Sequence, residues 1–525
     1  MTQRRTMWLG SMAMTRRQLI AAGAVGAAGA MTVSARSGAS IPLALSNPAG
    51  PRPRPSARIG KDLIPEIKHI IVVMMENHSY DNVLGTLGAL GRGNGLTFTG
   101  GDPRPTNTNP DGLGGAIRAF PMPTTVQFDA DPSQAWGASW TQFTGSATAS
   151  VIPTDPTALN RGFVISDSGP VSMGYFTPEQ LSFTTSMAMT FPIADAWHAS
   201  CLAQTYPNRR FMMGGTALGL TYNKLDGNLP PNGTIFQALS EHDISWANYF
   251  CDQPSSLIYL GQASLPGFGD HLKPISTYFD DAKNGTLPSV SLVDPNFGDA
   301  SQENPQDALH GEAFLRKVVL AAMNGKGWGE TMIVWLHDEH GGYYDHVAPP
   351  KAPKPDNAPI VPSIKSGDVW QGKASLPSFN RLGFRVPAGV VSPYAKAAYV
   401  SRQVYDHTSI LKLIEQKWNL PSFTPRDAAA NSPLDMIDLT SPPAFAVPPS
   451  LAPKIRDPKG RAVSTFIPGD QARTSEEVKY PDDGRLIKGK GHLRRQQFYT
   501  DGAGVERPSK GTTPFFQIFE DAWRS

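Results

Sequence analysis

Two apolar segments of the chain each run directly into a group of acid and amide side chains. Residues 67–75 and 331–336 are almost entirely apolar and rich in β-branched side chains. Such runs predict strands buried on both faces, as in parallel α/β sheets. Polar groups at the ends of such strands lie in the crevice where open α/β sheets bind ligands. The acid and amide side chains that follow the two segments are Glu76, Asn77, Asp338 and Glu339.

A threonine between the two segments could share this site. Thr205 opens the run T-Y-P-N-R, in which Pro207 is typical of the first turn of a helix. We therefore expect Thr205 just before a helix N-terminus, where backbone N–H groups favour negative charge. Carboxylate, amide and hydroxyl oxygens form a hard donor set that suits Mg²⁺, Ca²⁺ or Mn²⁺. The predicted ligands of this divalent cation are Glu76, Asn77, Thr205, Asp338 and Glu339.

The predicted cation gives the Thr205 hydroxyl a chemical role. A metal ion beside it would lower the pKa of the hydroxyl and make it a nucleophile toward a phosphorus or sulfur ester. That chemistry also needs donors around the transition-state charge, which Arg209, Asn77 and the helix N-terminus could provide. His340 and His346 could act as acid, base or oxyanion partner.

Each of these residues also has a purely structural interpretation. The acids at 338–339 precede two glycines, a pattern that is also typical of a solvated turn. Thr205 by itself is typical of a helix N-cap. For Asp345 and His346, a hydrogen bond within a loop explains the residues as well as direct contact with a substrate. The histidines that we expect to be core or capping residues are His78, His198, His242 and His407.

Strand-like and helix-like segments alternate along the chain, which predicts an α/β fold with a mainly parallel central sheet flanked by helices. Further strands are expected at 191–197, 244–250, 287–294 and 384–391. Helices are expected to begin at 178, with Thr177 as N-cap, and to cover 207–214, 232–239, 311–323 and 406–417. Residues 86–160 lack periodicity and are rich in Gly, Pro, Thr and Asn, which indicates a long functional loop or lid.

The N-terminus is typical of an export signal. A pair of arginines at 16–17 precedes a short, weakly apolar run, and this predicts a twin-arginine signal peptide over 1–35. The alternative is an N-terminal anchor helix, although the run is short and rich in Gly and Ala. We therefore expect a soluble mature protein, secreted or in the bacterial cell envelope or periplasm, that engages the twin-arginine export machinery.

The remaining organisation follows from composition. A linker is predicted at 36–60, a catalytic domain at 61–445 and a C-terminal extension packed on it at 446–525, with an amphipathic helix near 514–523. The net charge of +2 gives no argument for nucleic acid as a partner. Cys201 and Cys251 could form a disulfide in an exported protein or remain two buried thiols.

Four blocks of sequence resemble one known family. Residues 74–81 (M-M-E-N-H-S-Y-D), 205–209 (T-Y-P-N-R), 338–347 (D-E-H-G-G-Y-Y-D-H-V) and 405–410 (Y-D-H-T-S-I) look like motifs of a bacterial phosphoesterase family. That family contains phospholipases C and an acid phosphatase. The resemblance spans about residues 65–440, in the same order.

This resemblance implies an alkaline-phosphatase-like fold and a metal-dependent phosphoesterase whose threonine or serine nucleophile becomes phosphorylated. Carried over by position, Thr205 would be the nucleophile and an additional metal ligand. The other metal ligands would be Glu76, Asn77, Asp338 and Glu339.

Two positions depart from the family pattern. Gln134 and Asn304 stand where the family commonly has histidines that reach the phosphoryl group. Both amides can bind substrate as hydrogen-bond donors, but neither can serve as a cationic general acid. His271 and His310 lie nearby in the sequence as substitutes. The chain is also too short for the extra C-terminal β domains of the larger phospholipases.

Three hypotheses follow. The first is an exported metal-dependent phosphoesterase, phospholipase C-like, that hydrolyses a phosphate ester or phospholipid through a phosphothreonine on Thr205. The second is a related hydrolase that acts on a sulfate or a nonlipid phosphodiester. The third is a non-catalytic homologue that binds metal and phosphate, which Gln134 and Asn304 favour.

Overall fold

The computed structural model describes residues 50–99, 102, 104–127, 132–363, 369–373 and 375–451, with four short strands between residues 480 and 508. The predicted signal peptide, part of the predicted linker and the predicted helix at 514–523 lie outside the described residues.

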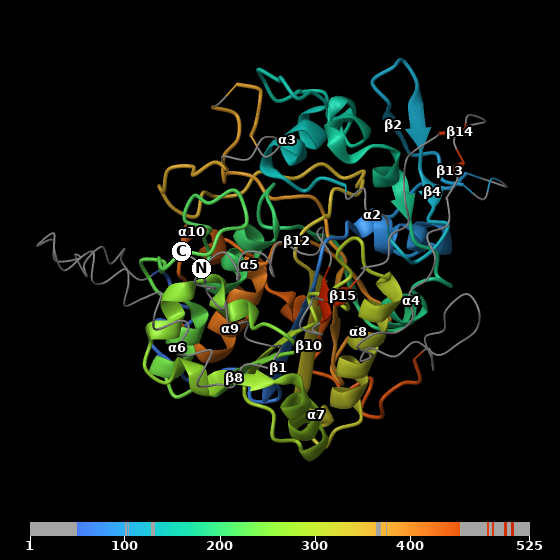
Figure 1. Cartoon of the computed structure of the whole chain (residues 1–525). Helices are drawn as coiled ribbons and strands as arrows, with labels where there is room; N and C mark the ends of the chain where they lie inside the picture. The colour runs from blue at the N-terminus through green and yellow to red at the C-terminus, as the bar shows by residue number, and fades with distance from the viewer. Residues whose placement is uncertain are drawn as a thin grey trace, which may run out of the picture.

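An eight-stranded sheet forms the centre of the molecule (Figure 1). Its strands, in spatial order, are β12 (Val400–Tyr405), β6 (Ile193–Trp197), β11 (Ala388–Val391), β10 (Thr331–His337), β1 (His69–Met75), β9 (Val290–Asp294), β7 (Trp246–Phe250) and β8 (Leu272–Pro274). Neighbours pair in parallel except at β11, which is antiparallel to both β10 and β6. The predicted α/β fold with a mainly parallel sheet is confirmed.

The two strands that carry the predicted ligands are neighbours, and their ends are level. β1 and β10 pair in an unbroken parallel register up to the last pair, Met75 opposite His337. Glu76 and Asp338 therefore leave the sheet at the same edge, one residue beyond that pair. This register follows from two apolar runs of equal length that are buried side by side.

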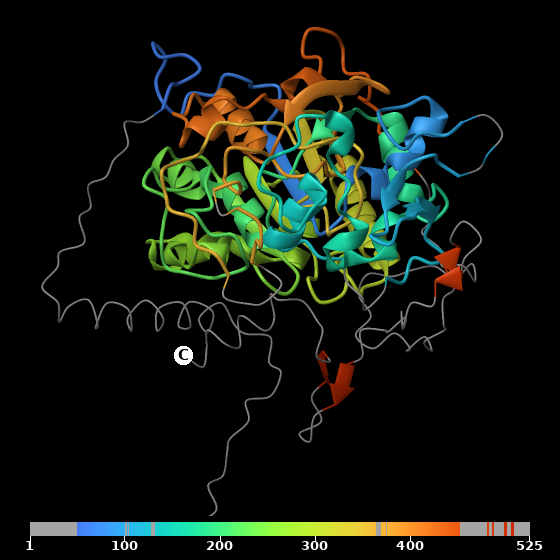
Figure 2. The same ribbon diagram turned by 90° about the horizontal axis from the view of Figure 1, so that it is seen from above.

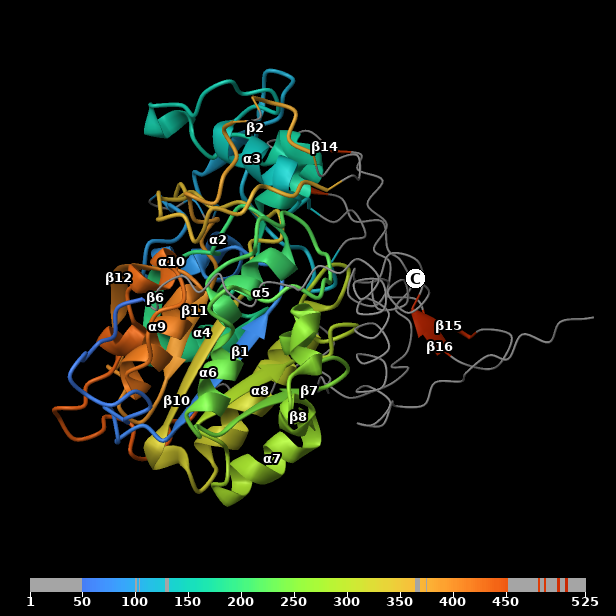
Figure 3. The same cartoon turned by 90° about the vertical axis from the view of Figure 1, so that its left-hand side faces the viewer.

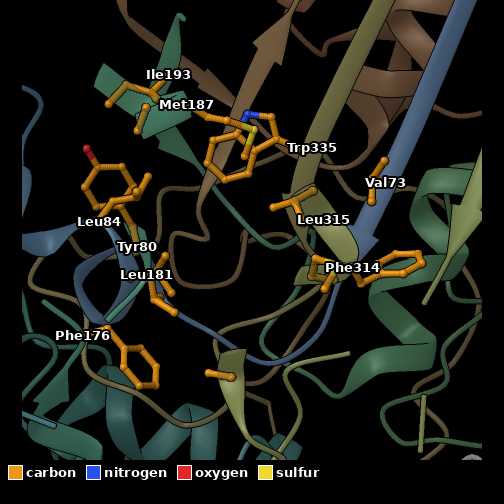
Figure 4. Packing of buried hydrophobic residues seen from close by; sticks show 14 of the residues in the cluster. Val73, Tyr80, Leu84, Phe176, Leu181, Met187, Ile193, Phe314, Leu315 and Trp335 are labelled. Atoms are coloured by element: carbon orange, nitrogen blue, oxygen red, sulfur yellow. The ribbon is translucent and has the colours of Figure 1, made fainter. Parts of the chain in front are cut away.

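Both faces of the sheet are buried. Successive side chains of β1 point to opposite faces, so Val73 packs with Trp335 and Phe314 on one side (Figure 4). Val72 packs with Val334 on the other side. Burial of each such side chain contributes about 1.5–3 kcal/mol, which fixes the register that aligns the strand ends.

Helices cover the two faces. The helices on the Val73 face are α4 (Ser182–Thr190), α7 (Ile275–Asn284) and α8 (Ala308–Met323). Those on the Val72 face are α5 (Thr205–Gly214), α6 (Ile235–Glu241) and α9 (Thr408–Trp418). Figure 3 shows α5 beside β1, where Arg209 of α5 donates to the carbonyl of Met75 at 3.3 Å.

The segment that was expected to be a long loop contains short elements of its own. They are a hairpin of β2 (Thr108–Pro110) and β3 (Ala116–Arg118), the strand β4 (Phe120–Pro121) and the helix α3 (Trp136–Thr144). Figure 2, which looks down on the molecule from above, shows the teal helix α3 in front of the sheet and the light-blue strands at the right. The segment therefore covers the edge at which β1 and β10 end.

The other short elements are α2 (Tyr80–Val83), β5 (Gly174–Tyr175), α10 (Pro425–Ala428), β13 (Tyr480–Pro481), β14 (Leu486–Ile487), β15 (Phe498–Thr500) and β16 (Glu506–Pro508). Among the described residues, no helix combines the length and the apolar character needed to cross a bilayer. Cys201 and Cys251 are free thiols rather than a disulfide.

Most expected elements begin two to four residues from their predicted starts, and Thr205, expected just before a helix, is the first residue of α5, with Gln204 as its N-cap. The helix expected to begin at 178 begins at Ser182, because the Gln180 side chain accepts the Thr177 N–H at 2.9 Å and closes a turn ahead of the helix. The strand expected at 384–391 is confined to β11, which begins directly after Pro387. Proline has no N–H to offer to a sheet ladder, so a strand start at this point is expected.

Candidate active site

Two loops that follow β1 and β10 run against each other. We call residues 76–81 the β1 loop and residues 338–346 the β10 loop. The Asp338 N–H donates to the Met75 carbonyl at 3.1 Å, and the Asn77 N–H donates to the Asp338 carboxylate at 3.2 Å. A side chain at Gly341 would meet the Asn77 carbonyl at 1.9 Å, and Gly341 also has a φ of +63°. The close approach of the loops thus requires glycine there.

Helix α5 brings a cation to the same point. Arg209 is fully buried, and its Nε donates to Asp338 at 2.9 Å. Its other nitrogens lie 3.6 Å from a Glu76 carboxylate oxygen and 3.8 Å from one of Asp294. Thr205 lies four residues earlier, in the first turn of α5, and is also buried. Residues four apart share a helix face, so Thr205 lies on the face of α5 that meets these carboxylates.

The carboxylates around Arg209 carry more negative charge than its guanidinium can balance. Three of them surround the single guanidinium of Arg209. Burial raises the pKa of Glu76 to about 8, and the negative charge of Asp338 adds to the rise. Arg209 and side-chain hydrogen bonds with Ser301 and Glu303 act in the opposite direction. An additional positive charge at this point would therefore restore Glu76 to its ionised form.

The side chain of Asn77 fits a metal ion at this place. Within the described part of the chain, neither its amide nitrogen nor its amide oxygen has a hydrogen-bond partner, although the residue is buried. An unsatisfied buried polar group costs about 1–3 kcal/mol. Asn77 also has a φ of +66°, which is uncommon for a residue other than glycine. Asn77 directly follows Glu76 and contacts Asp338 through its backbone N–H, and an amide oxygen together with these carboxylates matches the donor set of a hard divalent cation.

Histidines support the β10 loop from both sides. Nε2 of His407 donates to the Asp338 carbonyl at 2.5 Å, while its Nδ1 accepts from the Trp197 indole at 3.4 Å. The residue was expected to be a core or capping histidine, and it holds the backbone of a predicted ligand. His340 lies 2.7 Å from the Gln142 amide oxygen and 3.3 Å from a Glu339 carboxylate oxygen.

The surroundings of His340 determine its protonation. The Gln142 amide nitrogen donates to the Ser133 carbonyl at 2.8 Å, so its oxygen faces His340 and accepts from Nε2–H. Burial lowers the pKa of His340 to about 3. The imidazole is therefore neutral at pH 7, and its Nε2–H ties the β10 loop to helix α3 in the segment that covers the site.

His346 lies in a second polar cluster, at the far end of the two loops. Its Nδ1 is 2.6 Å from Asp81, and Asp345 lies close to both. The ligand atoms of these three residues lie within 4.8 Å of one another, a grouping that could hold a metal ion. Burial lowers the pKa of His346, but the charge and hydrogen bond of Asp81 outweigh burial and raise it overall. Arg385 also contacts both carboxylates of this cluster.

Comparison with known proteins identifies the family. The model of the phosphoesterase family matches residues 67–421, which include both loops, α5 and Arg385. The chain belongs to the phosphoesterase family.

Curated relatives of this phosphoesterase carry phospholipase C names. Non-specific phospholipase C6 of Arabidopsis thaliana is 29% identical over 438 residues, which cover 77% of this chain and 79% of that protein. Phospholipase C A of Mycobacterium tuberculosis is 28% identical over 432 residues, with 75% and 80% covered. Non-specific phospholipase C1 of Arabidopsis thaliana is 30% identical over 395 residues, with 70% of each chain covered. The protein is a phospholipase C-like member of a family of phosphoric ester hydrolases.

A solved structure shows a looser likeness. A protein in the alkaline phosphatase superfamily from Vibrio parahaemolyticus is 12% identical, with a TM-score of 0.32 and coverage of 82% of this chain and 93% of that one. No residue of the site is inferred from that likeness.

Of the two positions that depart from the family pattern, one lies beside the phosphoesterase site and the other is buried near the start of α3. Asn304 is buried next to Glu303, which hydrogen-bonds with Glu76, and its amide oxygen accepts from the Tyr343 hydroxyl at 3.0 Å. Gln134 is buried just ahead of α3.

Of the two histidines considered as substitutes, one lies away from the two loops and the other, near the start of α8, is paired with a carboxylate. His271 stacks on Trp246, the first residue of β7, at the opposite edge of the sheet from the two loops. His310 pairs with Asp299 at 2.8 Å.

Three groups of the phosphoesterase site were not identified from the sequence. Asp294 had a visible signal, because it ends β9, the other neighbour of β1 in the sheet, as an acid after an apolar run. Gln142 and Arg385 had no such signal in the sequence. Their partners, His340 and Asp81, are distant in sequence, and only the folded chain brings them together.

Proposed function

We propose that the protein hydrolyses a phosphate ester of the phospholipase C type, with Thr205 as the nucleophile. The observation that carries the proposal is the convergence of Arg209, from the helix that begins at Thr205, with the Glu76 and Asp338 carboxylates. Family membership supports the reaction class, and the names of the relatives support a phospholipid as substrate.

The proposed metal ligands come from both loops and from α5. They are Glu76, Asn77, Thr205, Asp338 and Glu339. The unsatisfied amide of Asn77 and the excess of carboxylates over guanidinium support a divalent cation here, for which Ca²⁺, Mg²⁺ and Mn²⁺ are the candidates. Such an ion supplies positive charge that stabilises an alkoxide and the nonbridging oxygens of the ester. Arg209 neutralises part of the carboxylate charge and fixes the positions of Glu76 and Asp338.

The proposed reaction proceeds in two displacements. The Thr205 oxygen forms a bond to phosphorus as the bond from phosphorus to the leaving oxygen breaks. The threonine hydroxyl loses its proton, and the leaving alkoxide takes one up to depart as an alcohol. In the second step a water oxygen attacks phosphorus, the threonine–phosphorus bond breaks, and the threonine oxygen regains a proton. The N–H groups at the start of α5 would stabilise the developing negative charge.

Further polar residues have proposed binding and positioning roles. The amide groups of Gln134 and Asn304 would donate hydrogen bonds to phosphoryl oxygens. His340 is neutral and hydrogen-bonded through Nε2–H to Gln142, so we assign it to holding the β10 loop against helix α3. His346 is bonded to Asp81, at the end of the β1 loop that lies away from Glu76.

Export by the twin-arginine route is also proposed, from the arginine pair at 16–17. Expression of the full chain in a bacterium with and without a functional twin-arginine system tests it. Mature protein outside the cytoplasm, present only with the system intact, is the expected result. Secretion that is independent of that system would contradict it.

A substrate panel tests the function. Purified protein with added Ca²⁺, Mg²⁺ or Mn²⁺ is assayed on phosphatidylcholine vesicles, an aryl phosphomonoester, an aryl phosphodiester and an aryl sulfate. Thr205→Ala is expected to abolish turnover and Thr205→Ser to retain part of it, while Thr157→Ala, at an exposed helix start, serves as the matched control. Turnover of the sulfate or the nonlipid diester alone would favour the related hydrolase. Phosphate binding without turnover of any compound would favour the non-catalytic homologue suggested by Gln134 and Asn304.

A further inference from the structure

The β1 and β10 loops are joined at a second place, beyond the proposed ligands. The Ser79 hydroxyl donates to the Tyr344 carbonyl at 2.6 Å, and the His346 N–H donates to the Asp81 carboxylate at 2.8 Å. Together with the bonds at Asp338, these contacts tie the loops at both ends. Like the near end, where Arg209 contacts Glu76 and Asp338, the far end closes on a buried cation.

That cation is Arg385, just ahead of β11. Its side chain is completely buried, and its Nε donates to Asp345 at 2.9 Å while one terminal nitrogen donates to Asp81 at 3.1 Å. The other terminal nitrogen donates to the carbonyls of Asn94 and Asp195, both at 2.9 Å. The guanidinium carbon also lies 4.3 Å from the centre of the Tyr80 ring.

We propose that Arg385 is a positioning residue that clamps the two loops together and thereby sets the geometry of the metal ligands; this rests on the proposed metal site. One carboxylate of the clamp, Asp81, is four residues beyond the ligand Asn77. The other, Asp345, is six residues beyond the ligand Glu339. The guanidinium therefore joins the two chain segments that each supply two of the five proposed ligands.

The clamp also accounts for the grouping of Asp81, Asp345 and His346. A cluster of two buried carboxylates and an imidazole has the composition of a metal site. Here the guanidinium of Arg385 contacts both carboxylates and supplies the compensating positive charge. A guanidinium has several N–H donors in fixed directions, so it can bind two carboxylates on separate chain segments better than the compact ammonium group of a lysine can. The inference is that this cluster binds no ion and that the protein binds one divalent cation at the proposed site.

The function of a clamp differs from that of a ligand. Loss of a ligand removes a bond to the ion, and excess ion cannot replace it. Loss of the clamp lets the ligands of the β1 loop and those of the β10 loop move apart, which weakens affinity for the ion but removes no ligand. Mutation of a group that orients a metal ligand without contacting the ion typically lowers the affinity for the ion by 10- to 100-fold.

Calorimetric titration of the full chain with Mn²⁺ tests the clamp. Asp81→Asn keeps the shape of the side chain and removes its charge. Arg385→Lys keeps the positive charge and removes the guanidinium donors that reach both carboxylates. We expect the wild type to bind one ion and each variant to bind one ion at least ten-fold more weakly. We also expect kcat to recover toward the wild-type value when Mn²⁺ is raised to saturation.

A matched control removes a different buried guanidinium. Arg92 is also buried, and its hydrogen bonds within the described part of the chain all go to backbone carbonyls. Arg92→Lys is expected to leave Mn²⁺ affinity within two- to three-fold of the wild type. If Arg385→Lys does not fold, the isosteric Asp81→Asn decides the matter alone.

Other results would overturn the inference in distinguishable ways. Wild-type affinity in Asp81→Asn, even with a lower melting temperature, would reduce Arg385 to a structural residue and leave the proposed function intact. Two ions on the wild type, of which Asp81→Asn loses one, would make the cluster a metal site. A wild type that binds no divalent cation would contradict the metal site of the proposed function, and the clamp with it.

Discussion

The backbone N–H of Asn77 donates to the carboxylate of Asp338 at 3.2 Å, across 261 positions of sequence. That bond joins the loops that follow two neighbouring strands, and it holds the backbone of Asn77 against the Asp338 carboxylate. The amide of Asn77 is nevertheless left unsatisfied among the described residues, in a backbone conformation that asparagine seldom adopts. A residue held in this way stores strain that a bound ion can offset.

Asn77→Gly is therefore predicted to stabilise the ion-free protein and to weaken metal binding. Glycine adopts a positive φ without the steric penalty of about 1–2 kcal/mol, and the unsatisfied amide is removed. Urea unfolding in a chelator should give a higher free energy of unfolding for the variant. Added Ca²⁺ or Mn²⁺ should raise the melting temperature of the wild type by more than that of the variant. A less stable ion-free variant would contradict this account of Asn77.

Stability of the ion-free protein should fall as the pH rises through neutrality. Burial raises the pKa of Glu76 from 4.5 to about 8, so between these values the folded state binds a proton that the unfolded chain does not. Unfolding then becomes easier with increasing pH. Urea unfolding in a chelator at pH 6 and pH 8 measures the difference, which Glu76→Gln should reduce; it should not vanish, because burial also raises the pKa of Asp252 and Glu312 to about 7.

Metal binding should show the opposite pH dependence. The ion requires the ionised carboxylate, so binding to the wild type displaces the proton of Glu76 and strengthens as the pH rises. Titrations with Mn²⁺ at the two pH values provide the check. Affinity that does not change with pH would place the ion away from Glu76.

Arg209→Met should destabilise the ion-free protein by about 3–5 kcal/mol, because it leaves buried carboxylates without their guanidinium. A divalent cation should recover part of that loss, since it supplies positive charge to the same carboxylates. Arg210→Met is the matched control on the same helix: it removes a buried arginine that pairs with Asp226 instead. Its destabilisation should not respond to metal. Equal recovery of both variants would argue against a cation between the loops.

Asn304→His should speed the departure of poor leaving groups. An imidazolium can donate a full proton to the leaving oxygen, which an amide cannot, and general acid catalysis contributes typically 10²–10⁴-fold. Comparison of kcat for an aryl phosphate and an alkyl phosphate measures this. The variant should gain on the alkyl ester and change little on the aryl ester. Gln134→His gives a second position for the same comparison, and equal effects on both esters would argue against leaving-group protonation at position 304.

The sheet and the placement of Glu76 and Asp338 were predictable, because both depend on local patterns. Two apolar runs of matching length define β1 and β10, and parallel strands of that kind end at one edge. Pro207 and the following glycines similarly marked the helix α5. The start of α4 was misplaced because a Gln180 side chain closes a turn that helix propensity does not report.

The residues that hold the two loops of the site in place could not be predicted in the same way. Arg385 reaches Asp81 across 304 positions, and Gln142 reaches His340 across 198. Neither arginine nor glutamine lies in a local pattern that specifies a partner, since only the folded chain determines which buried charge it meets. The unsatisfied amide of Asn77 is likewise a property of packing, whereas its residue type alone had suggested a ligand.

The most direct test of the central claim is to look for phosphate on Thr205. Enzyme mixed with an aryl phosphate and quenched in acid during turnover is digested and analysed by mass spectrometry. The account predicts a phosphopeptide with the phosphate on Thr205, absent from Thr205→Ala and from enzyme treated with a chelator. Full turnover with no phosphothreonine at any time, or with the phosphate on another residue, would contradict it.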